Sequence, residues 1–304
     1  MTQIEVTFLG TTAGVPTKYR NHAALHVKYK SQEEFSCLFD CGEGTQRQLL
    51  LAGINFMDID HIFISHWHAD HFAGLLGLLE TMNLEGRREP LRIYGPEASK
   101  FVPLLEALGY STKDFGLIPV DASFEGNETE TLMEGEEFVI QSIPMKHGIP
   151  AVAYALVEKD RVNIDKERAK AMGLPDKGPI FGKIKKDGEA LFKGKKITLE
   201  DIAKIISGKK IVYTGDTMPN RNIAKMAKNA DLLIHDSTFF EDVENMSGYK
   251  HTRADEAARL AKEANVKQLA LTHISRRYQS LKELEDYAKS KGAILATDLM
   301  KITV

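Results

Sequence analysis

Cysteine is almost absent from this chain. Of 304 residues only Cys37 and Cys41 are cysteines, so no second pair exists that could complete a zinc site built from thiolates. A structural disulfide is not expected either, because few cysteines are typical of proteins that stay in a reducing compartment. We therefore predict that both thiols are buried or free and that the protein is cytoplasmic.

Long apolar runs are missing as well. No stretch approaches the roughly 18 consecutive apolar residues that read as a membrane span. The first residues, Met1-Thr2-Gln3-Ile4-Glu5, lack the positive and apolar regions of a secretory signal peptide. The sequence predicts no membrane partner.

Neither sign of charge dominates. Forty Lys and Arg residues stand against 43 Asp and Glu, which gives a net charge of -3. No general attraction for nucleic acid is expected, so a polyanionic partner would need a local basic patch. A hydrophobic content of 43% is enough for a large core.

The most informative segment is the run His66-Trp67-His68-Ala69-Asp70-His71, directly after the apolar run 61–65. Three imidazoles and a carboxylate on one short loop have few uses besides binding metal. His66 and His68 do not share a helix face, but on a loop leaving a strand they can converge on one cation while Asp70 and His71 face a second. Ligands without thiolate favour zinc, with manganese or iron as alternatives.

Two metal ions need more ligands than this loop supplies. Further candidates follow strand-like apolar runs, where loops gather functional side chains at one sheet edge; they are His147, Asp216 and His273. We assign His66, His68 and His147 to one zinc ion and Asp70, His71 and His273 to the other, with Asp216 bridging them. Zinc lowers the pKa of bound water to about 7, and paired metals clamp both oxygens of a phosphoryl displacement.

Strand-like and helix-like segments alternate along the chain. Alternating or continuous apolar residues predict strands at Ile4–Leu9, Ala23–Tyr29, Phe35–Phe39, Ile62–Ile64, Ile211–Tyr213, Leu232–Ile234 and Leu269–Leu271. Helical spacing predicts helices at Thr45–Ala52, Gly74–Met82, Pro96–Leu108, Ile223–Lys228, Arg253–Ala264 and Leu281–Ser290. This alternation predicts sheets covered by helices on the outside.

One segment, 159–196, has a different character. It carries twelve Lys and Arg against six Asp and Glu, and its centre is so rich in glycine and proline that 173–183 cannot be one regular element. A solvated surface loop is one interpretation, and a basic segment that meets phosphates is the other.

With these motifs in place, the sequence resembles the ribonuclease Z family of the metallo-β-lactamase superfamily. The resemblance runs from Phe8-Leu9-Gly10-Thr11 to Thr272-His273-Ile274-Ser275, and it includes Phe39-Asp40-Cys41-Gly42-Glu43. It implies a four-layer αβ/βα sandwich that is one domain over 1–304. It also implies zinc-dependent removal of the 3′ trailer from precursor tRNA, which leaves a 3′-hydroxyl on the tRNA and a 5′-phosphate on the trailer. Asp40 would orient a metal-binding histidine.

Two further matches distinguish this family from its small-molecule relatives. Pro16-Thr17-Lys18-Tyr19-Arg20-Asn21 is similar to a loop with which family members sense the tRNA 3′ end, which implies substrate binding by Lys18 and Arg20. The segment 159–196 is similar to the protruding arm that grips tRNA, with Gly178, Pro179 and Lys183 as contacts. An arm that serves a second subunit implies a homodimer.

His251 matches a family histidine near the leaving group, so we expect it to donate a proton to the departing 3′ oxygen, while Asp70 is expected to handle a proton of the nucleophile. His235 is expected to be a buried supporting residue, and His22, His26 and His61 structural ones. The sequence departs from the family at His235-Asp236-Ser237-Thr238-Phe239, where His-Glu-Ala-Thr-Phe is common, and at Arg276, where proline is frequent.

Two other functions stay open at this point. A small-molecule phosphodiesterase or lactonase would use the same metals without Lys18, Arg20 or the basic segment. An RNA-binding or scaffold protein with a structural metal is disfavoured, because structural zinc sites are usually closed and rich in cysteine.

Overall fold

The computed structural model describes residues 2–108, 114–240 and 250–304. The chain forms two compact units, a main unit made of Met1–Val157 and Lys210–Val304, and an insert unit, Glu158–Lys209. No helix among the described residues is long and apolar enough to cross a membrane.

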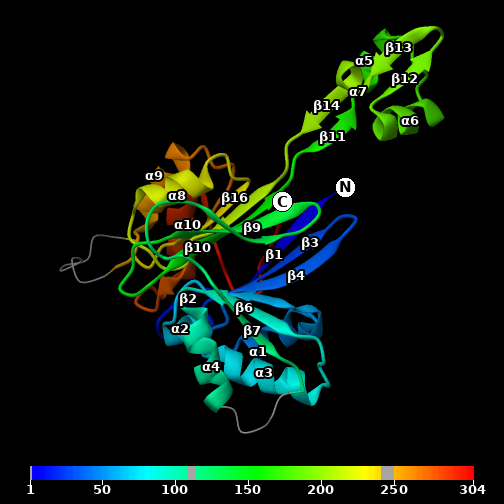
Figure 1. Cartoon of the computed structure of the whole chain (residues 1–304). Helices are drawn as coiled ribbons and strands as arrows, with labels where there is room; N and C mark the ends of the chain where they lie inside the picture. The colour runs from blue at the N-terminus through cyan, green and yellow to red at the C-terminus, as the bar shows by residue number, and fades with distance from the viewer. Residues whose placement is uncertain (1, 109–113, 241–249) are drawn as a thin grey trace. The chain divides into compact units, whose positions relative to one another are not determined.

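The main unit is built on two seven-stranded sheets (Figure 1). The first contains, in spatial order, β20 (Lys301–Thr303), β1 (Gln3–Gly10), β3 (Ala24–Lys30), β4 (Glu34–Phe39), β5 (His61–Phe63), β6 (Leu91–Gly95) and β7 (Leu117–Asp121). The second contains β19 (Ala293–Leu295), β17 (Leu269–Thr272), β16 (Leu232–Asp236), β15 (Lys210–Tyr213), β10 (Val152–Glu158), β9 (Phe138–Pro144) and β8 (Glu130–Glu134). A short ribbon pairs β2 (Thr12–Ala13) with β18 (Ile274–Ser275).

The two sheets pack face to face. Phe8 and Tyr29 of the first sheet share one buried cluster with Tyr154 and Tyr213 of the second. The rings of Phe39 and Tyr154 stack across this layer with their centroids 5.7 Å apart. Side chains from both inner faces therefore form the central core, as in other sheet-on-sheet folds.

Helices cover the outer face of each sheet (Figure 1). On the first sheet these are α1 (Thr45–Leu51), α2 (Ala69–Phe72), α3 (Gly74–Leu84) and α4 (Ala98–Leu108), with the short 3-10 turn η1 (Phe56–Asp58). On the second they are α8 (Arg221–Ala227), α9 (Ala254–Glu263) and α10 (Leu281–Ser290). In α9, Ala254, Ala257, Leu260 and Ala261 are buried, the spacing of an amphipathic helix. The predicted four-layer αβ/βα sandwich is confirmed.

Parallel pairing determines where the loops gather. β15, β16 and β17 run parallel to one another, and their continuous apolar sequences suit strands buried on both faces. Carboxyl ends of parallel strands meet at one sheet edge, where ligands bind in such sheets. Asp216, Asp236 and His273 stand at this edge.

The predicted helices and strands are all present, with ends that shift by a few residues. The helix predicted at Pro96–Leu108 begins at Ala98 instead. Cys37 and Cys41 are free and buried, as predicted.

The insert unit has a small core of its own, formed by Ala169, Leu174, Ile184, Ala190, Ile197 and Ile202. Its elements are β11 (Arg161–Ile164), α5 (Lys166–Ala171), α6 (Pro179–Asp187), β12 (Glu189–Phe192), β13 (Lys195–Thr198), α7 (Leu199–Ile202) and β14 (Ala203–Ile206). β11 pairs with β14 and β12 with β13. The unit is longer than the predicted segment 159–196, because β14 returns the chain beside β11.

Candidate active site

The loop 64–68 leaves β5 and leads into α2, as its mixture of apolar and metal-binding residues predicts. His66 and His71 are buried, whereas His68 is exposed and Asp70 partly buried. The ring of Trp67 is buried in the core beneath and donates a hydrogen bond from Nε1 to the carbonyl of Pro96, 2.5 Å away. The buried rings of His66, Trp67 and His71 hold this segment in place.

Three of the predicted zinc ligands form the first cluster. Nε2 of His66 lies 3.0 Å from Nδ1 of His68, and Nε2 of His147 lies 3.1 Å from that same Nδ1. The carbonyl of Lys250 lies 3.0 Å from Nδ1 of His147. Three ring nitrogens that converge in this way can bind one tetrahedral cation.

The second cluster consists of Asp70, His71, Asp216 and His273, whose ligand atoms lie within 4.8 Å of one another. Oδ1 of Asp216 is 3.3 Å from Nε2 of His71 and 3.2 Å from Nε2 of His273. Oδ2 of Asp216 is 3.7 Å from Nε2 of His66. Asp216 therefore faces both clusters, as a bridging ligand would.

The chemistry of these groups fits bound divalent metal. Oδ1 of Asp216 is buried and accepts no hydrogen bond from any described residue, although a buried carboxylate oxygen needs a partner. Burial alone would lower the pKa of His273, but the carboxylates of Asp216, Asp236 and Asp70 raise it to about 10. Positive charge is favoured between these carboxylates, and a metal cation would supply it.

Asp40 supports two ligands at once. Its Oδ2 lies 2.6 Å from Nδ1 of His71, and its oxygens accept hydrogen bonds from the backbone and hydroxyl of Ser65. The hydroxyl of Ser65 lies 3.0 Å from Nδ1 of His66. Tyr213 donates its hydroxyl to Asp40 at 2.6 Å. Asp40 thus orients His71 directly and His66 through Ser65, which leaves Nε2 of both rings facing the ligand clusters.

His251 lies beside the second cluster with a carboxylate that sequence reasoning missed. Oδ2 of Asp236 is 3.0 Å from Nδ1 of His251, and Oδ1 of Asp236 accepts a hydrogen bond from the Thr238 hydroxyl at 2.7 Å. That hydroxyl also lies 2.9 Å from Nδ1 of His273. Asp236 is the last residue of β16, which pairs with β15, the strand that precedes Asp216. The rule that predicted Asp216, a polar residue at the end of an apolar strand, therefore applies to Asp236 as well.

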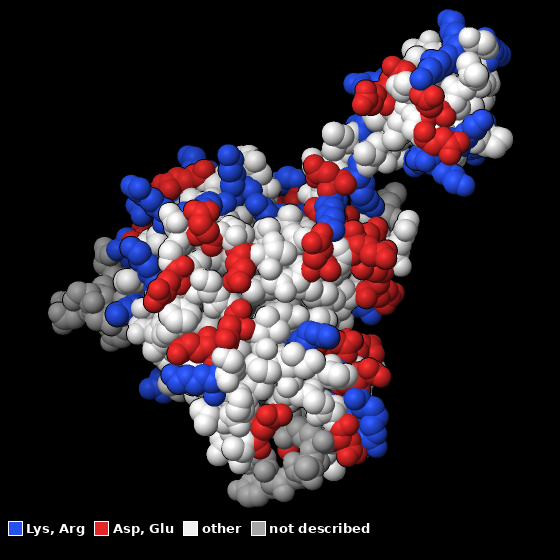
Figure 2. All heavy atoms as spheres, viewed as in Figure 1, with Lys and Arg blue, Asp and Glu red and all other residues white. Residues whose placement is uncertain are grey.

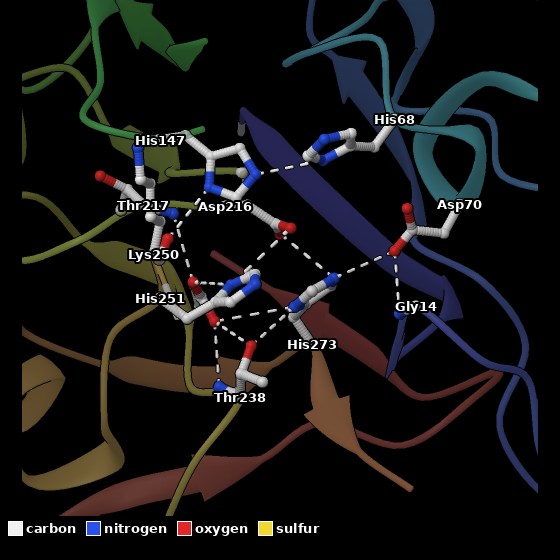
Figure 3. A network of polar contacts seen from close by, with 12 residues as sticks. Gly14, His68, Asp70, His147, Asp216, Thr217, Thr238, Lys250, His251 and His273 are labelled. Carbon is white, nitrogen blue, oxygen red and sulfur yellow. Dashed lines mark hydrogen bonds and ion pairs between the residues drawn. The ribbon is translucent and has the colours of Figure 1, made fainter. Parts of the chain in front are cut away.

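Figure 3 shows how these groups are arranged. Gly14 and Asp70 lie on one side of Asp216 and His273, and His251 lies on the other. The backbone N–H of Gly14 donates to Oδ2 of Asp70 at 2.9 Å. A cavity of about 260 Å³ lies over this network, with Gly14, Asp70, His251, Ser275 and Arg277 among its lining residues.

The two predicted substrate residues on the 16–21 loop have different surroundings. Lys18 is exposed. Arg20 is partly buried, and its Nη1 donates to the hydroxyl of Thr11 at 2.7 Å and to the carbonyl of Ala296 at 2.9 Å. Part of the Arg20 guanidinium therefore holds the loop to the protein, and substrate binding by this residue stays a prediction.

The remaining predicted residues lie outside the ligand clusters. Gly178, Pro179 and Lys183 belong to the insert unit, where they are exposed and Pro179 begins α6. His26 and His235 are buried and His22 and His61 partly buried, and no described contact joins these four rings to a ligand cluster.

The chain is similar to known proteins over nearly its whole length. The family model described as anti-Pycsar protein Apyc1 matches residues 4–159, and the beta-lactamase superfamily domain matches residues 200–274. Ribonuclease Z of Archaeoglobus fulgidus is 39% identical over 314 residues, covering 99% of this chain and 97% of that protein. Ribonuclease Z of Methanothermobacter thermautotrophicus is also 39% identical, with 99% and 97% covered.

Solved structures give the same result. The short form of human tRNase Z superposes with a TM-score of 0.68 at 27% identity, covering 98% of both chains. A metallo-beta-lactamase fold protein of Bacillus subtilis, YhfI, has a TM-score of 0.67 at 20% identity and covers all of both chains; at that identity it supports the fold alone. Because relatives 39% identical match it over nearly its whole length, the chain belongs to the ribonuclease Z family of the β-lactamase superfamily.

Proposed function

We propose that this protein is a zinc-dependent endoribonuclease that removes the 3′ trailer from precursor tRNA. The cut leaves a 3′-hydroxyl on the tRNA and a 5′-phosphate on the trailer. The observation that carries this proposal is the identity of 39% to ribonuclease Z proteins over 99% of the chain, combined with the two adjoining clusters of imidazole and carboxylate ligands.

The ligand sets support two Zn²⁺ ions per chain, with Mn²⁺ as the alternative. His66, His68 and His147 would hold one ion, Asp70, His71 and His273 the other, and Asp216 both. Bound there, the metal would supply Lewis acidity to the phosphate oxygens and a water nucleophile at neutral pH.

The protein's own residues supply the proton transfers. His251 donates a proton to the departing 3′ oxygen, and Asp236 holds its ring in position from Nδ1, 3.0 Å away. Asp70, held by the N–H of Gly14, accepts a proton of the nucleophile on the opposite side of the network (Figure 3).

The insert unit is the part of the chain that we assign to the tRNA body. It carries fourteen Lys and Arg against nine Asp and Glu, in a chain whose total charge is negative. On the face seen in Figure 2, basic side chains lie at its periphery and acidic ones between them. Contacts to phosphates by Lys183 and its neighbours on α6 would position the substrate without reading its sequence.

A second copy of this chain is the protein partner that we propose. Leu50 and Leu51 of α1 are 60% and 52% exposed, and Leu84 of α3 is 83% exposed. The two helices pack together through a hydrogen bond between Gln46 and Thr81, so their exposed leucines can form one apolar patch. Burying such a patch in a homodimer would stabilise the assembly. The cytoplasm is the compartment that we propose, in agreement with two free thiols.

The experiment that tests the function maps the cut at nucleotide resolution in a trailer-bearing tRNA precursor treated with zinc-loaded protein. We expect one cut, directly after the unpaired base that follows the acceptor stem, with a 3′-hydroxyl on the tRNA. Asp70→Ala should abolish it. Absence of this cut, together with two-metal binding and turnover of small phosphodiesters or lactones, would instead establish a small-molecule hydrolase.

A further inference from the structure

A hollow of about 470 Å³ lies at the edge of the second sheet that is opposite to the ligand clusters. It is formed by the second half of α9, the start of β17 and the turn after α10. Leu269, which lines the hollow, is the first residue of β17, whereas His273 directly follows the last residue of that strand. The hollow shares no lining residue with the catalytic cavity. None of the roles proposed above uses it.

The floor of the hollow is apolar. Ala261 and Leu269 are buried, and Val266 is partly buried against the same core cluster. Pockets of this size with an apolar lining and a few polar groups typically enclose a small molecule. The floor can therefore cover the flat face of an organic ring.

Four cations surround this floor, and no carboxylate is among the described residues that line it. The cations are the exposed side chains of Arg259, Lys262, Lys267 and Lys291. The main unit as a whole is acidic, with 34 Asp and Glu against 26 Lys and Arg. Like charges around one hollow repel one another, and an anion bound between them would relieve this repulsion.

Two of the cations have no carboxylate partner. Lys262 and Lys291 form no ion pair in the part of the chain that the structure describes. The nearest aromatic group to Nζ of Lys291 is Tyr287, whose ring centre is 5.1 Å away. Both ammonium groups can therefore donate to a ligand.

The other two cations are only partly paired. Nζ of Lys267 donates to Oδ1 of Asp231 at 2.5 Å, which uses one of the three donors of an ammonium group. The backbone N–H of Lys210 fixes Asp231 at 2.8 Å, so Lys267 is held in place. Nε of Arg259 is 4.0 Å from Oε1 of Glu263, too far for a hydrogen bond. Donors of all four side chains therefore remain for a ligand.

We propose that this hollow binds a nucleoside di- or triphosphate, with its base on the apolar floor and its phosphates among the four cations. One phosphate group carries a charge of about −2, which Lys262 and Lys291 alone would neutralise. The donors of Arg259 and Lys267 can meet a second or third phosphate. The enclosed shape and the apolar floor favour such a ligand over an extended RNA backbone. The site is independent of the proposed function, because no predicted metal ligand takes part in it.

The test measures binding to the zinc-loaded protein by isothermal titration calorimetry in excess Mg²⁺, with ATP, AMP and inorganic triphosphate as the probes. ATP should bind at least about tenfold more tightly than AMP, which lacks two phosphates and their charge-assisted hydrogen bonds. ATP should also bind more tightly than inorganic triphosphate, which has no base to bury on the floor.

Two double variants locate the binding. Lys262→Ala/Lys291→Ala should weaken ATP binding at least about tenfold. The matched control is Lys282→Ala/Lys289→Ala, which removes the same charge from two exposed lysines of α10 that do not line the hollow. It should bind ATP as the wild type does. All four lysines are exposed, so both variants should fold.

Three results would overturn the proposal. If ATP does not bind, or binds equally to both double variants, the hollow is not its site, and any shared binding belongs elsewhere, as at the metal clusters. Equal affinity for ATP and inorganic triphosphate would mean that the floor holds no base. If Lys262→Ala/Lys291→Ala binds ATP normally but raises KM for precursor tRNA, these cations meet an RNA backbone instead.

Discussion

The carboxylate of Asp236 lies 3.0 Å from Nδ1 of His251. Asp236 is fully buried, and the N–H of Thr238 donates to its other oxygen at 2.9 Å. Burial alone would lower the pKa of His251, but the negative charge of Asp236 raises it. The pairing fixes the orientation of the ring and leaves Nε2 to face a substrate.

Removing the imidazole of His251 should therefore impair the proton transfer to the departing 3′ oxygen. We expect His251→Ala to lower kcat on precursor tRNA by about 10² to 10⁴-fold, the usual contribution of a general acid. Asp236→Asn should lower kcat as well. A precursor with sulfur in place of the bridging 3′ oxygen at the cut should restore the rate of both variants, because a thiolate leaves without a proton. Equal losses on the oxygen and sulfur substrates would contradict the assignment.

Asp40 should determine metal affinity without touching the metal. Its hydrogen bond of 2.6 Å to Nδ1 of His71 orients this predicted ligand. Loss of such a partner typically lowers metal affinity by about 10 to 100-fold. We expect Asp40→Asn to bind zinc more weakly by this amount in a chelator competition. Asp58→Asn, an exposed carboxylate on η1, is the control and should bind zinc as the wild type does.

The insert unit should be needed for tRNA and dispensable for small substrates. Glu158 and Lys209 lie together at its base, where the N–H of Glu158 donates to the carbonyl of Lys209 at 2.8 Å. A short Gly-Ser turn can therefore replace residues 161–206. We expect kcat/KM for precursor tRNA to fall at least about a hundredfold, since several phosphate contacts are lost, while hydrolysis of bis(p-nitrophenyl) phosphate continues.

A milder variant tests the charges of the unit alone. Lys183, Lys185 and Lys186 are exposed on α6, so their replacement by alanine should leave the unit folded. Each lost phosphate contact should reduce the slope of log KM against log salt by roughly one. A slope equal to that of the wild type would show that these lysines do not meet the tRNA.

His26 should make the free energy of unfolding depend on pH. Burial lowers the pKa of His26 to about 4 in the folded protein, against about 6.5 in the unfolded chain. Between these values the unfolded state binds more protons, so stability falls as pH falls through this window. Between pH 7 and pH 5, His26 should therefore lower the free energy of unfolding by about 2 kcal/mol.

Urea unfolding of His26→Gln measures this contribution. The variant should lose less stability than the wild type over the same pH interval, by about 2 kcal/mol. The predicted metal ligands are the same in both proteins, so their contributions to the pH dependence of stability should cancel in the comparison. Parallel pH dependences would mean that His26 is protonated in the folded state.

Much of the site could be predicted from the sequence. His66, His68, Asp70 and His71 are neighbours on one loop, so their proximity does not depend on tertiary packing. His147, Asp216 and His273 were found because strand ends meet at a sheet edge. Asp236 obeys the same rule, yet only the structure pairs it with His251, because the choice of a hydrogen-bond partner depends on side-chain position and not on spacing.

The sequence by itself determined which residue types are present, which strands are buried, and which short loop carries candidate metal ligands. These are local properties of residue type and periodicity. Only the tertiary structure decided how Asp216 faces both ligand clusters, that Arg20 holds a loop through Thr11 and Ala296, and that Lys262 and Lys291 line one hollow. Such relationships arise from the packing of segments that are distant in the chain, and no local pattern encodes them.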